Sequence, residues 1–382
     1  MKVDKIPIST VCTGIYDGPH ATPPESEIGA IFLGIPNFKN GRLDFSNVRY
    51  ISEQDLPQWV RRVTPRANDI VFSYEATLHL YAIIPEGFRG CLGRRMALLR
   101  IDEHKAHYKY LFYYFQSKLW RETISHNLVL GSTVDRIPLI KFPSFPIVVP
   151  SLPLQRRIAF ILSVYDELIE KNNRKITILQ EQVQELYKEW FVRMHFPGHN
   201  NVKVENGLPE GWEKGRIEKL CVFARGKNIT ANEMQDGLIP VISAGIEPSG
   251  YHNSANVCGV SITVSSSGAN AGFVSIHYSD IWASDCSFVN NHDNIYYVYE
   301  LLNSIRPSIF NLQRGAAQPH VYPKDLNHLK LIIPDEKLQL RFNAVAEKIH
   351  STIAILIEEN ENVTRQRDLL LPRLMSGKLE VH

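Results

Sequence analysis

The residues with the clearest potential for catalysis are acidic and cationic side chains spaced like those of a metal-dependent nuclease. Asp69 precedes the run Glu103-His104-Lys105, which loosely follows the D…E-x-K pattern of such enzymes. Triplets of this kind arise often by chance, and Asp335-Glu336-Lys337 forms a similar cluster. The pattern by itself therefore does not indicate nuclease activity, and an enzyme is kept only as a rival interpretation.

Sequence motifs for nucleotide, metal and methyl-transfer chemistry are missing. The sequence has no glycine-rich nucleotide fingerprint after a strand, no G-x-x-x-x-G-K-[ST] and no H-E-x-x-H. It also has no N-P-P-[FY] or D-P-P-[FY] tetrapeptide of an amino-methyltransferase. His126, His320 and the other histidines form no cluster with metal-ligand spacing. We therefore expect no catalytic residue, no metal and no cofactor on this chain.

Length, hydropathy and cysteine usage restrict the class of protein. A chain of 382 residues exceeds one ordinary core, so two or more domains are expected. No apolar run reaches the roughly 18 residues of a membrane span, and the first residues lack the apolar stretch of a secretion signal. The five cysteines are scattered and odd in number, which favours a reducing, cytoplasmic location over a disulfide framework or a zinc site.

The elements that must position any functional residue come from an internal repeat. Residues 131–137 lie over residues 315–321, and the same frame continues without a gap. Leu-Gln-Arg-Arg at 154–157 then lies over Leu-Gln-Leu-Arg at 338–341. The sequence therefore predicts one module present twice.

Each copy of the repeat continues into a helical pattern in which apolar residues alternate four and three positions apart. The seam positions are Ile158, Leu162, Tyr165, Ile169, Asn172, Ile176, Leu179, Val183, Leu186 and Trp190, then Phe342, Ala346, Ile349, Ile353, Leu356, Asn360, Val363, Arg367, Leu370 and Leu374. A sustained 4,3 spacing is the signature of a coiled coil, and helices of about 35 residues would be roughly 50 Å long.

The matched phase of the two helices favours pairing with each other. Asn172 and Asn360 are polar interruptions that fix register at some cost in stability. Arg367 also falls on the seam, so we expect the distal end of the second helix to be loosely paired. The alternative is two ordinary amphipathic helices, each packed on its own domain.

The segments outside the helices, residues 1–150 and 196–334, contain short β-type runs punctuated by Gly, Pro, Asn and Ser. Residues 70–77 match 262–269, and residues 92–96 match 283–287. The strand frame is shared but the polar side chains differ: Tyr74-Glu75 lies over Ser266-Ser267, and Arg94-Arg95 lies over Asp285-Cys286. One scaffold with different polar side chains indicates two modules that read two different things.

With this order of features the chain resembles the specificity subunit of Type I restriction-modification systems. The resemblance covers essentially the whole chain, and the order of the motifs and the repeat carry it rather than any single motif. The residues concerned are Leu208-Pro209-Glu210-Gly211-Trp212, the repeats 131–155 and 315–339, the tail Leu371-Pro372-Arg373-Leu374-Met375-Ser376-Gly377, and segments 17–23, 37–41 and 265–272, which are similar to parts of target-recognition domains.

The resemblance implies an α+β fold with a pseudo-two-fold internal repeat. Two mixed α/β target-recognition domains, residues 1–150 and 196–334, would be separated by an antiparallel coiled coil of two long helices, residues 151–195 and 335–382. It also implies a non-catalytic subunit that recognises a bipartite target in double-stranded DNA. Two methyltransferase (modification) subunits would dock on it and a restriction (translocase) subunit could join, so S-adenosylmethionine, ATP and Mg²⁺ are expected on these partners only.

For such a subunit, base-edge contacts set sequence specificity and phosphate contacts supply much of the affinity. Arg94 and Arg95 suit guanine, because a guanidinium donates two hydrogen bonds to one guanine edge, Glu75 suits cytosine and Asn270 suits adenine. The candidate base-reading residues are Tyr74, Glu75, His79, Arg94, Arg95, Ser266, Ser267, Asn270 and Asp285, and the candidate phosphate contacts are Lys39, Arg42, Lys227 and Arg314.

The charge balance limits how tightly this chain can bind DNA alone. Its net charge is +2, with a small excess of Lys and Arg in residues 1–150 and of Asp and Glu in residues 196–334. Because phosphate neutralisation drives most nonspecific affinity, we expect weak, salt-sensitive binding by the isolated chain. Besides the enzyme, two rivals remain open: a coiled-coil adaptor that binds only protein, and a specificity subunit that serves a fused nuclease-methyltransferase.

Overall fold

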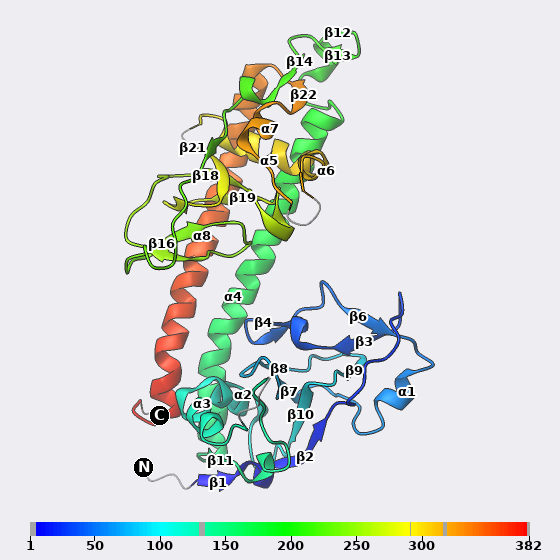
Figure 1. Ribbon diagram of the computed structural model, residues 1–382, viewed down its shortest axis with the longest axis vertical. Coiled ribbons are helices and arrows are strands. Elements are labelled where there is room, and N and C mark those ends of the chain that lie inside the picture. Colours follow the sequence, from blue (N-terminus) through cyan, green and yellow to red (C-terminus); the bar gives the residue numbers. More distant parts are fainter. Residues whose placement is uncertain (1–4, 130–133, 291, 316–318, 380–382) are drawn as a thin grey trace. The chain divides into compact units, whose positions relative to one another are not determined.

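The computed structural model describes residues 5–129, 134–290, 292–315 and 319–379. The chain forms two compact units (Figure 1). Unit 1 comprises Met1–Glu170 and Asn360–His382, and unit 2 comprises Lys171–Glu359. Within the described residues, no helix is both long enough and apolar enough to cross a membrane.

Unit 1 contains a four-stranded antiparallel sheet in the order β2-β10-β7-β8 and a three-stranded sheet in the order β6-β3-β9. Its strands are β1 Lys5–Pro7, β2 Cys12–Asp17, β3 Ala30–Leu33, β4 Phe38–Lys39, β5 Arg42–Leu43, β6 Arg49–Ile51, β7 Ile70–Ser73, β8 Tyr81–Ile83, β9 Gly90–Leu92, β10 Met96–Ile101 and β11 Pro146–Val148. Its short helices are α1 Leu56–Trp59, α2 Tyr108–Gln116 and α3 Lys118–Ser125.

Strand β7 shows why this sheet forms. All four of its residues are buried, and successive side chains of a strand point to opposite faces. Ile70 and Phe72 therefore join a hydrophobic cluster with α2 and α3, whereas Val71 joins a second cluster with Leu33. The sheet is covered on both faces, as the apolar runs in the sequence require.

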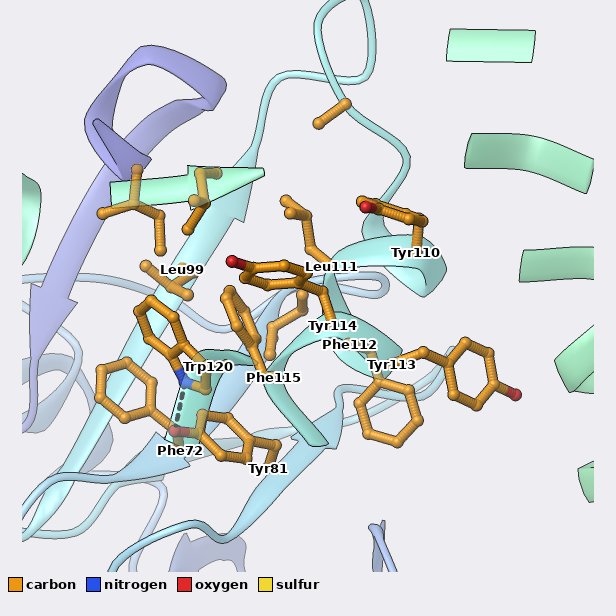
Figure 2. Close-up of a cluster of buried hydrophobic side chains, with 14 of the residues drawn as sticks. Phe72, Tyr81, Leu99, Tyr110, Leu111, Phe112, Tyr113, Tyr114, Phe115 and Trp120 are labelled. Carbon is orange, nitrogen blue, oxygen red and sulfur yellow. Dashed lines mark hydrogen bonds between the residues drawn. The ribbon is translucent and has the colours of Figure 1, made fainter. Parts of the chain in front are cut away.

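Aromatic residues fill the first of these clusters (Figure 2). Trp120 is fully buried, and its indole Nε1 donates a hydrogen bond of 2.7 Å to the hydroxyl of Tyr81. The ring centroids of Phe115 and Trp120 lie 4.9 Å apart, and those of Phe72 and Phe142 lie 5.0 Å apart. Large apolar rings with a satisfied polar atom are a strong source of core stability, which fixes α2 and α3 against the sheet.

Unit 2 has the same strand pattern, with sheets in the orders β15-β21-β18-β19 and β17-β16-β20. Its strands are β12 Val204–Glu205, β13 Leu208–Pro209, β14 Glu213–Arg216, β15 Ala224–Arg225, β16 Ile239–Ile242, β17 Gly250–His252, β18 Ser261–Ser265, β19 Val274–His277, β20 Trp282–Ala283, β21 Cys286–Asn290 and β22 Lys330–Ile333. Its short helices are α5 Ile295–Ser304, α6 Arg306–Phe310 and α7 Pro323–Asn327. In both units the middle strand of the three-stranded sheet has one antiparallel and one parallel neighbour.

The strand register corrects one detail of the predicted repeat. Met96 pairs with Ser73 in unit 1, and Cys286 pairs with Ser265 in unit 2. Cys286 therefore takes the place of Met96, and Asp285 that of Arg95. The sequence match had set Asp285 over Arg94, which is wrong by one residue because unit 2 has a shorter turn before β21.

Both long helices that the 4,3 spacing predicts are present: α4 at Leu152–Tyr187, followed by a π-helical turn at Lys188–Val192, and α8 at Glu336–Met375. Every predicted seam position is buried or half-buried. In unit 2, Asn172 Nδ2 donates a 2.9 Å hydrogen bond to Glu359 Oε2, and the rings of Tyr187 and Phe342 lie 5.7 Å apart. Late α4 thus contacts early α8 in this unit.

In unit 1, early α4 contacts late α8. Arg367 Nη1 donates a hydrogen bond of 2.6 Å to Asp166 Oδ1, and Leu374 and Met375 are buried in the same cluster as Leu162. The expectation that the distal end of α8 is loosely paired is therefore wrong. Arg367 does not weaken the seam, because a carboxylate from the facing helix meets its guanidinium.

His277 gives the fold of unit 2 a pH dependence that can be measured. Its Nε2 lies 2.8 Å from Thr263 Oγ1, and burial lowers the pKa of His277 from 6.5 to about 4. The imidazole of His277 is protonated at higher pH in the unfolded chain than in the folded chain. The stability of unit 2 that depends on the neutral imidazole is therefore fully present above pH 6.5 and is lost as the pH falls toward 4. We expect about 1–2 kcal/mol to be lost over this window, since the ring keeps some contact with water.

Denaturant titrations at several pH values measure this loss. His277→Gln removes the titrating group, so the stability of that variant should depend less on pH between 6.5 and 4. Equal pH slopes for the wild type and His277→Gln would show that the imidazole is not the responsible group.

Candidate nucleic-acid interface

The antiparallel sheet of unit 1 brings three loops to one of its ends. Strands β2 and β7 finish at Asp17 and Ser73, and strands β8 and β10 start at Tyr81 and Met96. Because neighbouring strands run in opposite directions, these four strand ends lie at the same end of the sheet. We call residues 17–23, 74–80 and 93–95 loop edge 1.

Tyr74 holds two of these loops together. Its side chain is buried, its hydroxyl donates a 2.8 Å hydrogen bond to the carbonyl of Arg94, and its amide donates to the carbonyl of Arg95 over 3.1 Å. Burial raises the pKa of Tyr74, and the nearby charges of Glu75 and Asp17 raise it further. The phenol therefore stays protonated and acts as a brace for the backbone at Arg94.

Most charged side chains described at loop edge 1 have a partner of opposite charge. Arg95 Nε lies 3.7 Å from Glu75 Oε1, and Arg62 Nη1 lies 2.5 Å from Asp17 Oδ1. Exposed Arg94 differs from them, because its guanidinium has no partner among the residues that the structure describes. Loop edge 1 thus presents one uncommitted guanidinium on a braced backbone.

Sequence reasoning missed Asp17 and Arg62 as members of this cluster. Asp17 opens the segment 17–23 that resembles target-recognition domains, so that segment carried a usable signal. Arg62 comes from the loop after α1, where no sequence motif pointed to it.

His79 is the remaining predicted residue at this edge. It has φ 63°, and burial together with Arg121 lowers its pKa. Left-handed backbone at a non-glycine residue is costly and often occurs at functional loops.

Unit 2 builds an equivalent edge with different chemistry. Residues 225–227, 266–273 and 284–285, which we call loop edge 2, flank the corresponding strand ends. The Asp285 carboxylate accepts a hydrogen bond from the Ser267 hydroxyl and forms an ion pair with Arg225, whose Nη2 lies 2.5 Å from Asp285 Oδ1. Ser266 is fully buried, and its hydroxyl has no partner in the described part of the chain. Sequence reasoning did not include Arg225, which lies two residues before the predicted Lys227.

Backbone hydrogen bonds join the predicted repeat segments to both loop edges. The amide of Ile137 donates 2.8 Å to the carbonyl of Tyr74, and the amide of Val321 donates 2.9 Å to the carbonyl of Ser266. Next to Val321, the backbone of His320 forms an antiparallel bridge with the backbone of Arg314. The guanidinium of Arg314 pairs with the Asp325 carboxylate. Residues 131–133 and 316–318 of the repeat lie outside the described residues.

The other predicted residues lie on the β4–β5 hairpin or at loop edge 2. Lys39 is exposed on the β4–β5 hairpin, 3.9 Å from Asp44 Oδ2, and Arg42 on the same hairpin contacts α4. Lys227 is exposed, and its Nζ lies 5.9 Å from the Trp282 ring centroid. Asn270 ends a short 3₁₀ helix at Gly268–Asn270 and is half-buried at loop edge 2.

The aspartate of the nuclease-like pattern has structural partners. Asp69 is buried, and its carboxylate accepts hydrogen bonds of 2.9 and 2.7 Å from Arg100 and one of 2.8 Å from the Arg66 amide. Across the described residues, no group of three His, Cys, Asp or Glu side chains is placed to hold a metal ion.

Comparisons with known proteins agree on one family. The sequence profile described as Type I restriction modification DNA specificity domain matches residues 30–180 and 209–365. The Type I restriction enzyme MjaIX specificity subunit of Methanocaldococcus jannaschii is 25% identical over 303 residues, 72% of this chain and 69% of that protein. The putative type I restriction enzyme MjaX specificity subunit of the same organism is 25% identical over 397 residues, 96% and 91% of the two chains.

A solved structure has the same fold. The crystal structure of the Type-I restriction-modification system S subunit from M. genitalium superposes with a TM-score of 0.58 at 17% sequence identity. The match covers 98% of this chain and 96% of that chain. The fold of this chain is thus shared at low sequence identity.

The bracing role of Tyr74 can be tested without any ligand. Tyr74→Phe removes the hydroxyl that binds the Arg94 carbonyl. We expect amide hydrogen exchange across residues 93–96 to become roughly fivefold faster, because one buried hydrogen bond contributes about 1 kcal/mol. Tyr251→Phe is the control, since the Tyr251 side chain is exposed in unit 2. Unchanged exchange at residues 93–96 in Tyr74→Phe would contradict the brace.

Proposed function

The chain belongs to the Type I restriction-modification DNA specificity family, and from this premise we propose that it recognises a bipartite target in double-stranded DNA. Each loop edge reads one half-site. The observation that carries this proposal is that two sheets of the same strand order bring chemically different side chains to the same end of the sheet. A common frame with different donors and acceptors is what the reading of two unlike half-sites requires.

Loop edge 1 is suited to guanine. Arg94 is exposed, and the Tyr74 hydroxyl fixes its backbone, so binding of its guanidinium to a base edge orders the side chain but not the loop backbone. Arg95 and Glu75 lie beside each other and pair in the free protein. A DNA base that bonded either of them would have to compete with this ion pair, which makes Arg94 the main reader.

Loop edge 2 is suited to bases other than guanine. Asp285 stands where unit 1 has Arg95, so a carboxylate that only accepts hydrogen bonds replaces a donor to guanine, and a cytosine that bonded it would have to compete with Arg225 and Ser267. Asn270 carries a side-chain amide, which can bond both the donor and the acceptor on the major-groove edge of adenine. The acidic balance of residues 196–334 further limits phosphate binding by this unit.

The long helices then serve as the spacer between the half-sites. We infer an antiparallel coiled coil with pseudo-two-fold symmetry. The burial of the seam positions supports it, as do the Asp166–Arg367 contact within unit 1 and the Asn172–Glu359 contact within unit 2. Helices paired in opposite directions would carry the two recognition domains at opposite ends.

Partner enzymes supply the chemistry in this proposal. Relatives of this chain are specificity subunits of type I restriction enzymes. We propose that this chain is likewise non-catalytic, that two methyltransferase subunits dock on it and that a restriction translocase subunit joins. S-adenosylmethionine, ATP and Mg²⁺ would then be bound by those partners, which would also supply much of the affinity for DNA.

Exchange of one recognition domain tests the modular arrangement. Residues 1–150 end in the loop before Leu152, where α4 begins, so this junction leaves the helix intact. Replacement of residues 1–150 by the corresponding domain of another family member should change one half-site and leave the other and the gap unchanged. Methylated motifs, mapped by sequencing after co-expression with a matching modification subunit, report the result. A change in both half-sites would contradict modular reading.

Arg94 and Lys39 test base reading against phosphate binding in unit 1. Arg94→Ala should relax discrimination at one base pair by about 1–3 kcal/mol, roughly 5- to 150-fold, because the guanine loses the two hydrogen-bond donors of the guanidinium. Lys39→Ala should instead weaken binding to all sequences equally and reduce the salt slope by about one. Competition binding on DNA with single substitutions, with the partner methyltransferase present, separates the two effects. Uniform loss in Arg94→Ala would exclude it as a base reader.

A further inference from the structure

The β4–β5 hairpin distinguishes the two units. In unit 1 it lies between β3 and β6, whereas in unit 2 the corresponding stretch, residues 243–249 between β16 and β17, contains no strand. The hairpin turns at Asn40 and Gly41, both in left-handed backbone with φ 51° and 76°. This insertion therefore gives unit 1 a rigid projection for which unit 2 has no counterpart in that stretch.

The base of the hairpin is fixed to the sheet of unit 1. Phe38 and Leu43 pack against the hydrophobic cluster that contains Leu33. Asn37 is buried, and its side chain accepts a 2.9 Å hydrogen bond from the Gly34 amide and donates one of 3.3 Å to the carbonyl of Asp44. A side chain carried by this hairpin is therefore held in place relative to the recognition domain.

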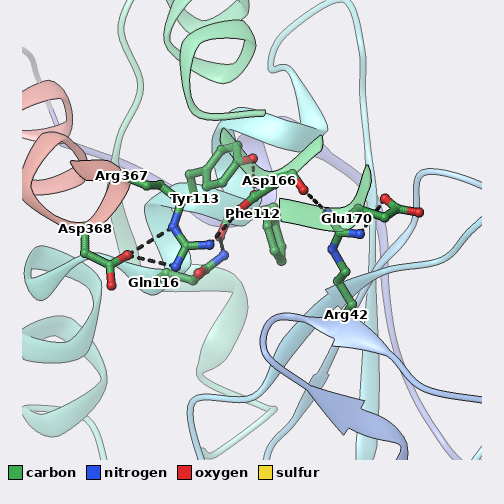
Figure 3. Close-up of polar contacts among 8 residues, drawn as sticks. All are labelled: Arg42, Phe112, Tyr113, Gln116, Asp166, Glu170, Arg367 and Asp368. Carbon is green, nitrogen blue, oxygen red and sulfur yellow. Dashed lines mark hydrogen bonds and ion pairs between the residues drawn. The ribbon is translucent and has the colours of Figure 1, made fainter. Parts of the chain in front are cut away.

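Arg42 connects the hairpin to the long helix α4 (Figure 3). Its Nη1 donates a 2.5 Å hydrogen bond to Glu170 Oε2, and its Nη2 donates one of 2.7 Å to the backbone carbonyl of Asp166. The two acceptors lie one helical turn apart, which the planar guanidinium spans with two donors. A lysine has one donor group and cannot reproduce this geometry.

The helix is itself fixed at Asp166. The Tyr113 hydroxyl on α2 donates a 2.5 Å hydrogen bond to Asp166 Oδ2, and Arg367 on α8 donates to Oδ1 over 2.6 Å. Burial, with Asp166 beside it, raises the pKa of Tyr113, so this phenol remains a donor. Asp166 thus ties α2, α8 and, through its carbonyl, the hairpin to one point of α4 (Figure 3).

This connection lies in an open groove. The groove has a volume of about 450 Å³ and is lined by Arg42, Asp166, Glu170 and Arg367 among others. The corresponding anchor of unit 2 is closed, because the repeat frame places His350 over Asp166, and His350 pairs with Glu300 at 3.2 Å with both side chains 1% exposed. Water and salt therefore reach the anchor of unit 1 and not that of unit 2.

We propose that Arg42 is a positioning residue that latches the recognition domain of unit 1 onto α4. The latch fixes the angle at which loop edge 1 meets DNA, so it determines which gap between the half-sites is accepted. This inference rests on the proposed function. It also assigns Arg42 a role different from the phosphate contact predicted from the sequence, because its guanidinium is already bound by Glu170 and Asp166.

The experiment uses the full chain, co-expressed with a matching modification subunit whose target has been mapped. Methylation is measured on DNA that keeps both half-sites but has the gap lengthened or shortened by one or two base pairs. Arg42→Ala should raise methylation at the altered gaps, relative to the preferred gap, by roughly two- to fivefold, the size expected for a partly exposed ion pair. The half-site sequences should stay the same.

Glu170→Ala is the deciding variant, because it removes the ion pair of the latch and leaves the Arg42 guanidinium with only the Asp166 carbonyl as partner, so its Nη1 becomes available to phosphate. It should reproduce the Arg42→Ala result, and the double variant should show no further change. Arg42→Lys should restore only part of the gap selectivity. Lys39→Ala, on the same hairpin, should leave gap selectivity intact. Circular dichroism of each variant shows whether the chain remains folded.

Two results would overturn the latch. Arg42→Ala could weaken methylation equally at all gaps with a reduced salt slope while Glu170→Ala does not, which identifies a phosphate contact. Alternatively, both variants could keep the wild-type gap profile. Failure of the proposed function looks different: the wild-type chain and its partner would then methylate no two-part sequence at all.

Discussion

The antiparallel register of the two four-stranded sheets is the constraint on which the rest of the structure depends. Because β7 and β10 run in opposite directions, Tyr74 at the end of one strand meets Arg94 and Arg95 at the start of the other. A shift of one residue would exchange the faces of each strand and separate these loops. The hydrophobic clusters on both faces of β7 exclude such a shift, so core packing determines the loop geometry.

Polar contacts between α4 and α8 add specificity to the helices. Asp166 with Arg367, and Asn172 with Glu359, join residues far apart in the sequence, and one partner of each pair lies on the predicted seam. Pairs of this kind contribute little net stability, since desolvation offsets most of their attraction. A shift of either helix by one turn would leave these groups unpaired at a half-buried position, which penalises wrong registers.

The sequence predicted what is periodic and missed a one-residue change in a turn and the pairings between distant segments. The helices and the doubled module follow from spacing, and the seam positions are buried or half-buried as expected. The one-residue slip near Asp285 was missed because a turn can lose a residue without any change of strand pattern. Arg367 was judged without Asp166, which faces it from another helix, and the partners of Arg42 and Arg62 come from distant segments. Pairings of this kind are set by the folded chain.

The two loop edges show how a frame can stay constant while its chemistry changes. The contacts that define them, Ile137 to Tyr74 and Val321 to Ser266, join backbone amides to backbone carbonyls. Backbone hydrogen bonds do not depend on side-chain type, so Tyr74 and Ser266 occupy equivalent places with unlike side chains. Each edge then needs its own support: a buried tyrosine braces the first, and Asp285 with Ser267 holds the second. New specificity therefore requires a matched change of reader and brace, not of the reader alone.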